Sequence, residues 1–243
     1  TWLKGAAENG IYSVAYKIPS LLNVVQSIFS SAWTLSSVKE YDDESKTEFY
    51  SEIYAIYNVA MVLICSCLLM ANRLIARILF ANEFYSAWQY SPYLMLSTLF
   101  GALSGYVGGI YSAAKNTKII SISTVVGALI NLGLNIILVY YIGTVGAAIA
   151  TLVSYIVVWI IRMICLKKIV ILKINYVKHI ISYFLLLTQC IIWSCNLNSI
   201  VLYSIEGVIL IAICIMYFKD IKKLILKLIS MIKNKSKKEE VNI

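Results

Sequence analysis

The residues most able to do chemistry lie on one face of an apolar segment near the start of the chain. Between residues 10 and 36, polar side chains recur at intervals of three or four positions, which places them along a single helix face. One of them is a lysine. An ammonium group inside a membrane helix is costly and usually faces a bundle interior or a water-filled cavity. The stripe consists of Ser13, Lys17, Ser20, Asn23, Ser27, Ser30 and Thr34, widened by Gln26 and Ser31.

Lys17 is the cation of this stripe, and Pro19 follows two residues later. Proline removes a backbone donor, so we expect the helix to kink or open here. Lys17 in this position can contact an anionic substrate in a central cavity, with Asn23 and Gln26 lining the same cavity. The alternative is a structural lysine that extends to the outer membrane interface or pairs with an acid.

A second candidate surface lies in the apolar segment 119–141. Thr124, Asn131 and Asn135 fall on one helix face there. Asparagine side chains in lipid need hydrogen-bond partners. Bonding to a neighbouring helix and lining of a substrate cavity are the two interpretations of this face.

Glu206 is the one acid well inside an apolar segment. It must pair, become protonated or face water, so a proton-coupling or portal role and a structural contact both stay open. The sequence has no metal-ligand cluster, no phosphate-binding glycine loop and no nucleophile–base pair in a large loop. We therefore predict no metal, no cofactor and no catalytic residue.

The elements that must position these residues are membrane helices. The chain has 243 residues, of which 60% are hydrophobic and 14% charged, and its mean hydropathy is +0.81. Soluble domains are about 45–50% apolar and about 25% charged. The hydrophobic residues gather into runs near the roughly 20 residues that cross a bilayer. We predict an all-α, polytopic membrane helix bundle with about seven transmembrane helices, at residues 10–36, 53–71, 91–114, 119–141, 144–165, 179–196 and 199–218.

The distribution of charge predicts the orientation of these helices. Most of the 21 Lys and Arg residues, Arg162 counted among them, fall in alternate loops or in the segment after residue 218. An excess of Lys and Arg marks cytoplasmic loops, so we place the C-terminus in the cytoplasm and the chain in the cytoplasmic (inner) cell membrane. Arg73 and Arg77 then lie in an outer loop. The same pattern accounts for the net charge of +9, so nucleic acid is not a predicted partner.

These features divide the chain into three parts. Residues 1–165 form a transmembrane core of five helices, and residues 166–218 add two further transmembrane helices. Residues 219–243 form a basic tail whose apolar residues recur at helical spacing, which predicts an amphipathic helix against membrane lipids. The chain begins with Thr1 instead of Met and lacks a signal peptide, so we expect an upstream part to be missing.

Four stretches together resemble the C-terminal half of the oligosaccharide flippases, the polysaccharide biosynthesis proteins of the multidrug/oligosaccharidyl-lipid/polysaccharide exporter superfamily. The resemblance spans about residues 9–165, and the order and spacing of the pieces agree. The pieces are "GIYSVAYKIPSLL" with Ala32–Trp33, "ILFANEFYSAWQYSPYLMLSTLF", "YSAAKNTK", and the pair Asn131 and Asn135 followed by "IGTVGAAIAT".

The resemblance implies a protein of about 12 to 14 helices in two lobes, of which this chain would supply the C-terminal lobe. In that family, basic residues line a central cavity and accommodate the pyrophosphate or acidic sugars of a polyprenyl-linked oligosaccharide. Lys17 matches a basic position of the "YSVAYK" motif, and Arg73 and Arg77 would lie near the outer mouth. The implied partners are the lipid-linked oligosaccharide, the missing N-terminal lobe and membrane lipids. The implied mechanism is alternating access without any bond made or broken, so the resemblance predicts a transporter and not an enzyme.

Two other function classes stay open at this point. A cation-coupled multidrug or small-molecule exporter of the same superfamily would need a buried carboxylate in the missing lobe. A membrane enzyme, such as a polymerase or glycosyltransferase, would need a large outer loop with paired acids and arginines. The longest outer loop predicted here, about residues 72–90, contains one acid, Glu83.

Overall fold

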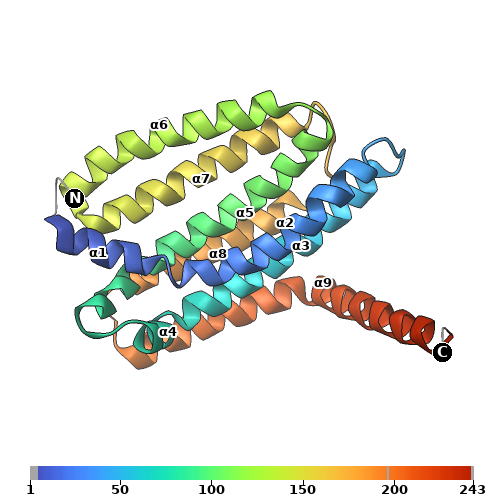
Figure 1. Cartoon of the computed structure of the whole chain (residues 1–243). Helices are drawn as coiled ribbons and strands as arrows, with labels where there is room; N and C mark the ends of the chain where they lie inside the picture. The colour runs from blue at the N-terminus through green and yellow to red at the C-terminus, as the bar shows by residue number, and fades with distance from the viewer. Residues whose placement is uncertain (1–4, 196, 242–243) are drawn as a thin grey trace.

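The computed structural model describes the backbone of residues 5–195 and 197–241 and the side chains of residues 7–195 and 197–222. Within these ranges the chain consists of helices joined by short connections (Figure 1). They are α1 (Gly5–Ala15), α2 (Pro19–Lys39), α3 (Lys46–Met70), α4 (Asn72–Leu79), the 3₁₀ helix η1 (Asn82–Gln89), α5 (Ser91–Ala113), α6 (Thr117–Ile142), α7 (Thr144–Leu166), α8 (Tyr176–Ser194) and α9 (Ser199–Val241).

Six helices in the described part of the chain are long and apolar enough to cross a membrane. They are α3, α5, α6, α7, α8 and the part of α9 from Ser199 to Lys222. This confirms the predicted all-α fold of a multi-pass membrane protein. The predicted first span, residues 10–36, is not among the six. It is divided near Pro19, where the helix was expected to kink or open. A turn at residues 16–18 divides it into α1 and α2, because Pro19 interrupts the backbone hydrogen bonds.

The connections between helices gather at two opposite ends of the bundle (Figure 1). One end holds the α2–α3, α5–α6 and α7–α8 connections, which together with the helix ends beside them carry most of the described lysines. The other end holds the α6–α7 turn, α4, η1 and the α8–α9 connection. The loops that the charge pattern grouped on one side of the membrane therefore do lie together.

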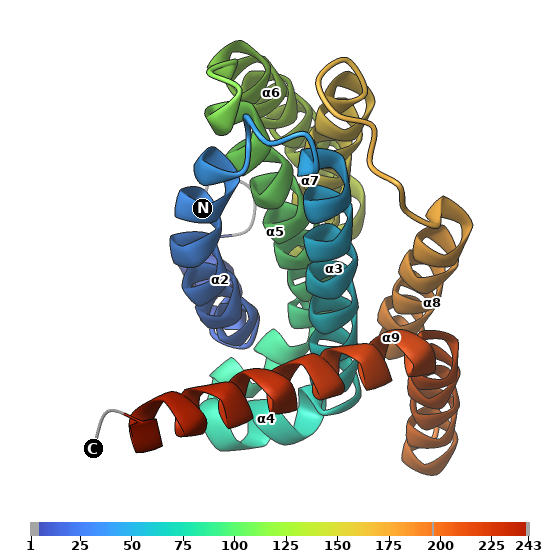
Figure 2. The same ribbon diagram turned by 90° about the vertical axis from the view of Figure 1, so that its right-hand side faces the viewer.

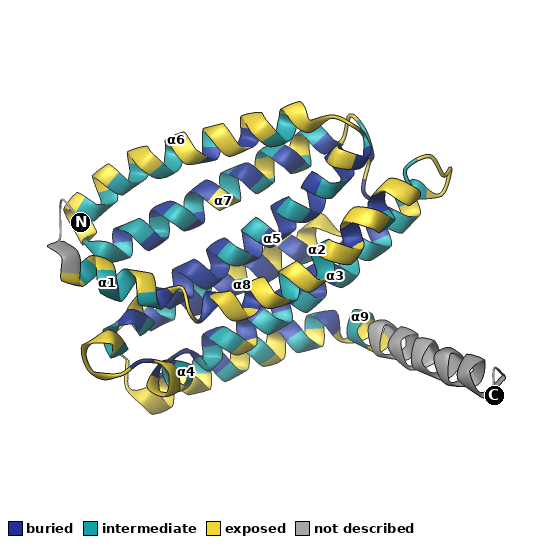
Figure 3. Ribbon diagram, viewed as in Figure 1, coloured by how far each residue is buried: buried dark blue, intermediate teal, exposed yellow. Residues whose placement is uncertain are grey.

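Helix α5 is the most buried of the membrane-spanning helices (Figure 3). In its most apolar window 78% of the residues are buried, against 11% for α6. α2, α3, α7 and α8 all contact it. α2 lies on one flank of α3 and α5, whereas α8 lies on the other (Figure 2).

A glycine on α5 allows α2 to pack closely through its tryptophan. A Cβ atom at Gly109 would lie 2.4 Å from Nε1 of Trp33, which is closer than atoms approach without a shift. Trp33 is held in this place, because its ring stacks on Tyr106 with 4.2 Å between centroids. Its Nε1 also donates to the Tyr106 carbonyl oxygen at 2.9 Å. The position of α2 therefore depends on residue 109 being a glycine.

A buried polar network holds α8 and α9 against α3. Asn58 Nδ2 lies 2.6 Å from His179 Nδ1, and Asn58 Oδ1 accepts a hydrogen bond from the Tyr183 hydroxyl at 2.5 Å. On α9, the Tyr217 hydroxyl lies 3.0 Å from Ser182 Oγ and 3.3 Å from Asn58 Nδ2. These bonds satisfy polar groups that lipid could not.

Helix α9 continues without interruption from Ser199 to Val241. The predicted basic amphipathic tail, residues 219–243, falls in its last part. Side chains after residue 222, and residues 242–243 altogether, lie outside the described residues. The contact of this tail with membrane lipids stays a prediction.

The packing at residue 109 can be tested with a pair of glycine variants. Gly109→Ala is expected to lower the free energy of unfolding by about 1–3 kcal/mol, as overpacking does in well-packed cores, because the new methyl group must displace Trp33. Gly133→Ala on α6 is the control, since nothing lies within 4 Å of a Cβ at that position. Thermal unfolding of the purified variants in detergent measures the difference. Equal melting temperatures for the two variants would contradict the close approach.

Candidate functional site

The helix is interrupted at residues 16–18, just before Pro19, as the sequence predicted. Because proline has no N–H, the carbonyl oxygen of Ala15 loses the donor four residues later. The Ser91 hydroxyl, at the start of α5, lies 3.3 Å from this oxygen and 3.1 Å from the Ala87 carbonyl oxygen, so its hydrogen is shared between them. Ser91 thus replaces the missing donor, and α5 stabilises the turn between α1 and α2.

Three of the predicted site residues lie on or just after this turn. Lys17 and Asn23 are exposed, and Gln26 is half-buried with its Nε2 beside Gly105 of α5. Among the described residues, none of the three side chains makes a hydrogen bond or an ion pair. They are therefore available to a partner that the described residues do not supply.

The hydroxyl groups of the same stripe behave differently. Those of Ser20, Ser27, Ser31 and Thr34 each donate to a carbonyl oxygen three or four residues earlier, at 2.6–3.0 Å. These hydroxyls are satisfied within their own helix and tolerate an apolar surrounding. The need for a polar surrounding on this face comes from the lysine and the two amides.

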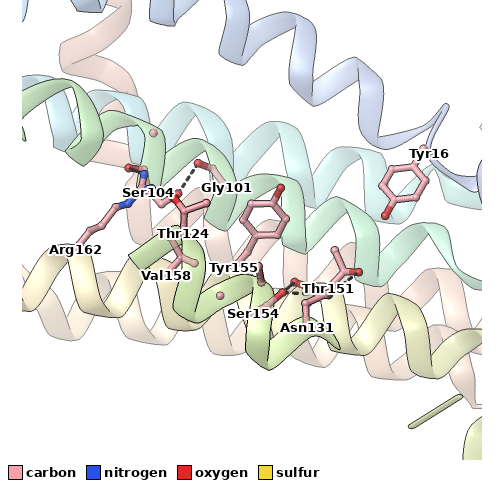
Figure 4. Close-up of a pocket in the computed structure, with 13 residues that line it drawn as sticks. Tyr16, Gly101, Ser104, Thr124, Asn131, Thr151, Ser154, Tyr155, Val158 and Arg162 are labelled. Carbon is pink, nitrogen blue, oxygen red and sulfur yellow. Dashed lines mark hydrogen bonds between the residues drawn. The ribbon is translucent and has the colours of Figure 1, made fainter. Parts of the chain in front are cut away.

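A pocket of about 440 Å³ lies between α5, α6 and α7, and Tyr16 of the turn also lines it (Figure 4). Its volume is within the range of small-molecule sites. The pocket has room because several lining residues are glycine or alanine, and hydroxyl and amide groups make it polar. The other lining residues are Gly101, Ser104 and Gly105 from α5, Thr124, Gly127, Ala128 and Asn131 from α6, and Thr151, Ser154, Tyr155, Val158 and Arg162 from α7.

Asn131 is the predicted site residue that lines this pocket. Its Nδ2 donates across to α7, 3.4 Å from Thr151 Oγ1 and 3.3 Å from Ser154 Oγ. Asn135 does not line the pocket, and its Nδ2 donates to Asn131, 3.1 Å from Oδ1 and 2.9 Å from the carbonyl oxygen. Asn131 thus combines the two interpretations of this face, because it bonds to a neighbouring helix and lines the cavity.

Arg162 is the pocket residue that the sequence analysis placed wrongly. Counted there among the loop cations, it lies within α7, about 6 Å along the axis before the helix ends at Leu166, and only 7% of it is exposed. Its guanidinium donates to Ser123 Oγ and to the Ser104 carbonyl oxygen at 2.9 Å, and to Thr124 Oγ1 at 3.0 Å. The error arose because a cation so near a helix end cannot be told from a loop cation by charge counting.

The two predicted outer arginines lie on α4, away from this pocket. The Arg73 guanidinium packs over the ring of Trp88, 4.2 Å from its centroid, and lies 5.4 Å from that of Trp193. Arg77 is exposed at the same end of the bundle. Arg73 is thus held by aromatic rings, whereas Arg77 is open to a ligand.

Glu206 is fully buried between α8 and α9. Its Oε2 accepts a hydrogen bond from Gln189 Nε2 at 2.8 Å, and Gln189 Oε1 accepts one from the Ser66 hydroxyl at 2.8 Å. Glu206 Oε1 has no hydrogen-bond partner among the described residues. The described residues also contain no group of His, Cys, Asp and Glu side chains that could hold a metal ion.

Comparison with known proteins gives one informative likeness. No protein-family model matches the sequence, and no curated protein is significantly similar to it. Among solved structures, the chain is similar to the lipid II flippase MurJ in its inward closed conformation, with a TM-score of 0.58 and 16% sequence identity. The match covers 87% of this chain and 48% of that one. The chain has the fold of about half of that flippase.

The role of Ser91 at the α1–α2 turn can be tested with a double-mutant cycle. Ser91→Ala is expected to cost about 1–3 kcal/mol of unfolding free energy, because it leaves the buried Ala15 carbonyl without a donor. In a Pro19→Ala background the cost should be smaller, since residue 19 then has an N–H that can reach this oxygen. Thermal unfolding in detergent measures all four proteins. An equal cost in both backgrounds would contradict the proposed replacement of the missing donor.

Proposed function

We propose that the chain forms the C-terminal lobe of a two-lobe transporter, which flips a polyprenyl-pyrophosphate-linked oligosaccharide across the cytoplasmic membrane for cell-surface polysaccharide biosynthesis. The glycan crosses through a hydrophilic cavity while the lipid tail stays outside, and no covalent bond changes. The fold likeness to about half of a lipid II flippase supports a lipid-linked substrate and a second lobe. The "YSVAYK" motif supports Lys17 as a substrate contact.

The observation that carries this proposal is the set of unsatisfied side chains beside the α1–α2 turn. Burying an amide without a partner costs about 2–7 kcal/mol, and an ammonium group costs more. Lys17, Asn23 and Gln26 therefore face water, substrate or another part of the protein, and not lipid. The pocket that Tyr16 lines extends this polar surface toward α6 and α7. A second lobe over this face would enclose the hydrophilic cavity that alternating access needs.

Two further roles belong to the same proposal. Arg77, with Arg73 beside it on α4, contacts the substrate at the outer mouth of the cavity. Glu206 couples transport to a proton gradient, because an acid buried inside the membrane, with one oxygen unpartnered among the described residues, is typical of a proton-relay site. Gln189 holds the other carboxyl oxygen in either protonation state.

The first test of the proposal changes Lys17 in cells that produce the full-length protein. In the Lys17→Ala variant, lipid-linked glycan should accumulate in the cytoplasmic leaflet and export should fall about tenfold, the effect of losing one charge-assisted hydrogen bond. Lys17→Arg should retain export. Lys39→Ala removes an exposed lysine from the other end of α2 and serves as the control.

Two results would speak against this role of Lys17. Normal glycan export by Lys17→Ala, at the protein level of the wild type, would make Lys17 a structural residue. Loss of drug resistance with unchanged glycan export would favour the small-molecule exporter instead.

The coupling role is tested with Glu206→Gln in proteoliposomes. The amide keeps the size of the side chain and the bond from Gln189 but cannot ionise. Transport by this variant should no longer accelerate when a proton gradient is imposed. Glu83→Gln, at an exposed position in η1, is the matched control and should respond as the wild type does. A full response of Glu206→Gln to the gradient would assign Glu206 a structural role.

A further inference from the structure

We propose that the pocket between α5, α6 and α7 is an anion-binding site in which Arg162 contacts a phosphoryl or carboxylate group. Lys17 is not among its lining residues, which apart from Tyr16 all lie on these three helices. This anion site adds detail to the proposed function, and the identity of its natural ligand rests on that proposed function. The binding itself can be measured with a soluble anion.

The charge of the pocket is the first argument. No Asp or Glu occurs between Glu83 and Glu206, so α5, α6 and α7 carry no acid. The described bonds of Arg162 go to hydroxyl and carbonyl oxygens, which orient the guanidinium without neutralising it. A buried cation without a counter-charge is costly. An anion in the adjoining space would supply that counter-charge.

The donor inventory of the guanidinium is the second argument. Arginine has five N–H groups. In the described structure Nε donates to Ser123, Nη1 to Ser104, and Nη2 to Thr124 and, at 3.5 Å, to the Ile120 carbonyl oxygen. One hydrogen on Nη1 remains without an acceptor among the described residues. The bonds on the other nitrogens fix the plane of the group, so a ligand meets a pre-oriented donor.

The order of the lining residues is the third argument. Arg162 lies at one end of the pocket, and Thr151 and Asn131 lie toward the other (Figure 4). Thr151 and Arg162 are eleven positions apart on α7, a rise of about 16 Å. Ser154 and Tyr155 lie between them. A ligand with an anionic group at one end and a hydroxyl-rich part at the other fits this sequence of contacts.

The binding experiment uses the full-length protein in phosphatidylcholine nanodiscs and equilibrium dialysis with radiolabelled inorganic pyrophosphate. The wild type should bind saturably, and Arg162→Gln should bind about tenfold more weakly or worse, as expected for the loss of a charged hydrogen-bond donor. Lys118→Gln removes an exposed cation near the same end of α6. It should change the affinity by less than about twofold, because exposed charges are screened.

A second variant addresses the pocket without touching Arg162. Ala128 lines the pocket and is exposed, so Ala128→Phe fills space there while every bond of Arg162 stays in place. This variant should also weaken pyrophosphate binding. If Arg162→Gln fails to elute as a folded protein in size-exclusion chromatography, the affinity of Ala128→Phe for pyrophosphate decides whether the pocket is the binding site.

Two outcomes would overturn the inference. One is wild-type affinity in both pocket variants, and the other is an equal loss of binding in Lys118→Gln, which would assign binding to the surface charge. Adding phosphatidylglycerol to the nanodiscs separates two sources of the anion. If phosphatidylglycerol competes with pyrophosphate, the natural anion is a lipid headgroup. If it does not compete, the natural anion is a phosphate-bearing ligand other than a bilayer lipid. Either result retains the site.

The inference and the proposed function can fail separately. Pyrophosphate binding through Arg162 in a protein that flips no lipid-linked glycan would retain the anion site and reject the transport proposal. Glycan flipping by a wild-type protein that binds no pyrophosphate would reject the anion site alone.

Discussion

Close packing on α5 is the constraint on which the arrangement of the site depends. Trp33 of α2 rests against Gly109, and the ring of Tyr155 on α7 would lie 3.2 Å from a Cβ atom at Gly101. These contacts fix α2 and α7 on two sides of the same buried helix. Because the residues of α5 that face the pocket are small, the helices meet at these points and leave a polar space between them.

Much of the fold could be predicted from the sequence, because the features that determine it are local. The length of each apolar run sets the membrane spans, and the missing N–H of Pro19 sets the opening between α1 and α2. The sequence could not show how that opening is satisfied. The donor, Ser91, lies 76 residues from Ala15, and no periodicity connects the two positions.

The candidate site was predicted only in part, because only some of its features are local in the sequence. The polar stripe with Lys17, and Asn131 on its helix face, follow from helical spacing. Arg162 was missed because its burial depends on Ser104 and Ser123, which belong to two other helices. One signal in the sequence could have raised the question, namely the complete absence of acids between Glu83 and Glu206 around this arginine.

The opening at Pro19 also bears on the order in which this chain enters the bilayer. Unlike the six apolar helices, α1 and α2 lack the length or composition of an independent span, and a lysine near the centre of a span costs about 2.5–3.5 kcal/mol on insertion scales. Two of the contacts that hold them, Ser91 at Ala15 and the Tyr106 carbonyl at Trp33, come from α5. That helix leaves the ribosome more than 70 residues later. The early part of the chain can therefore reach this packing only after α5, its partner, has been synthesised.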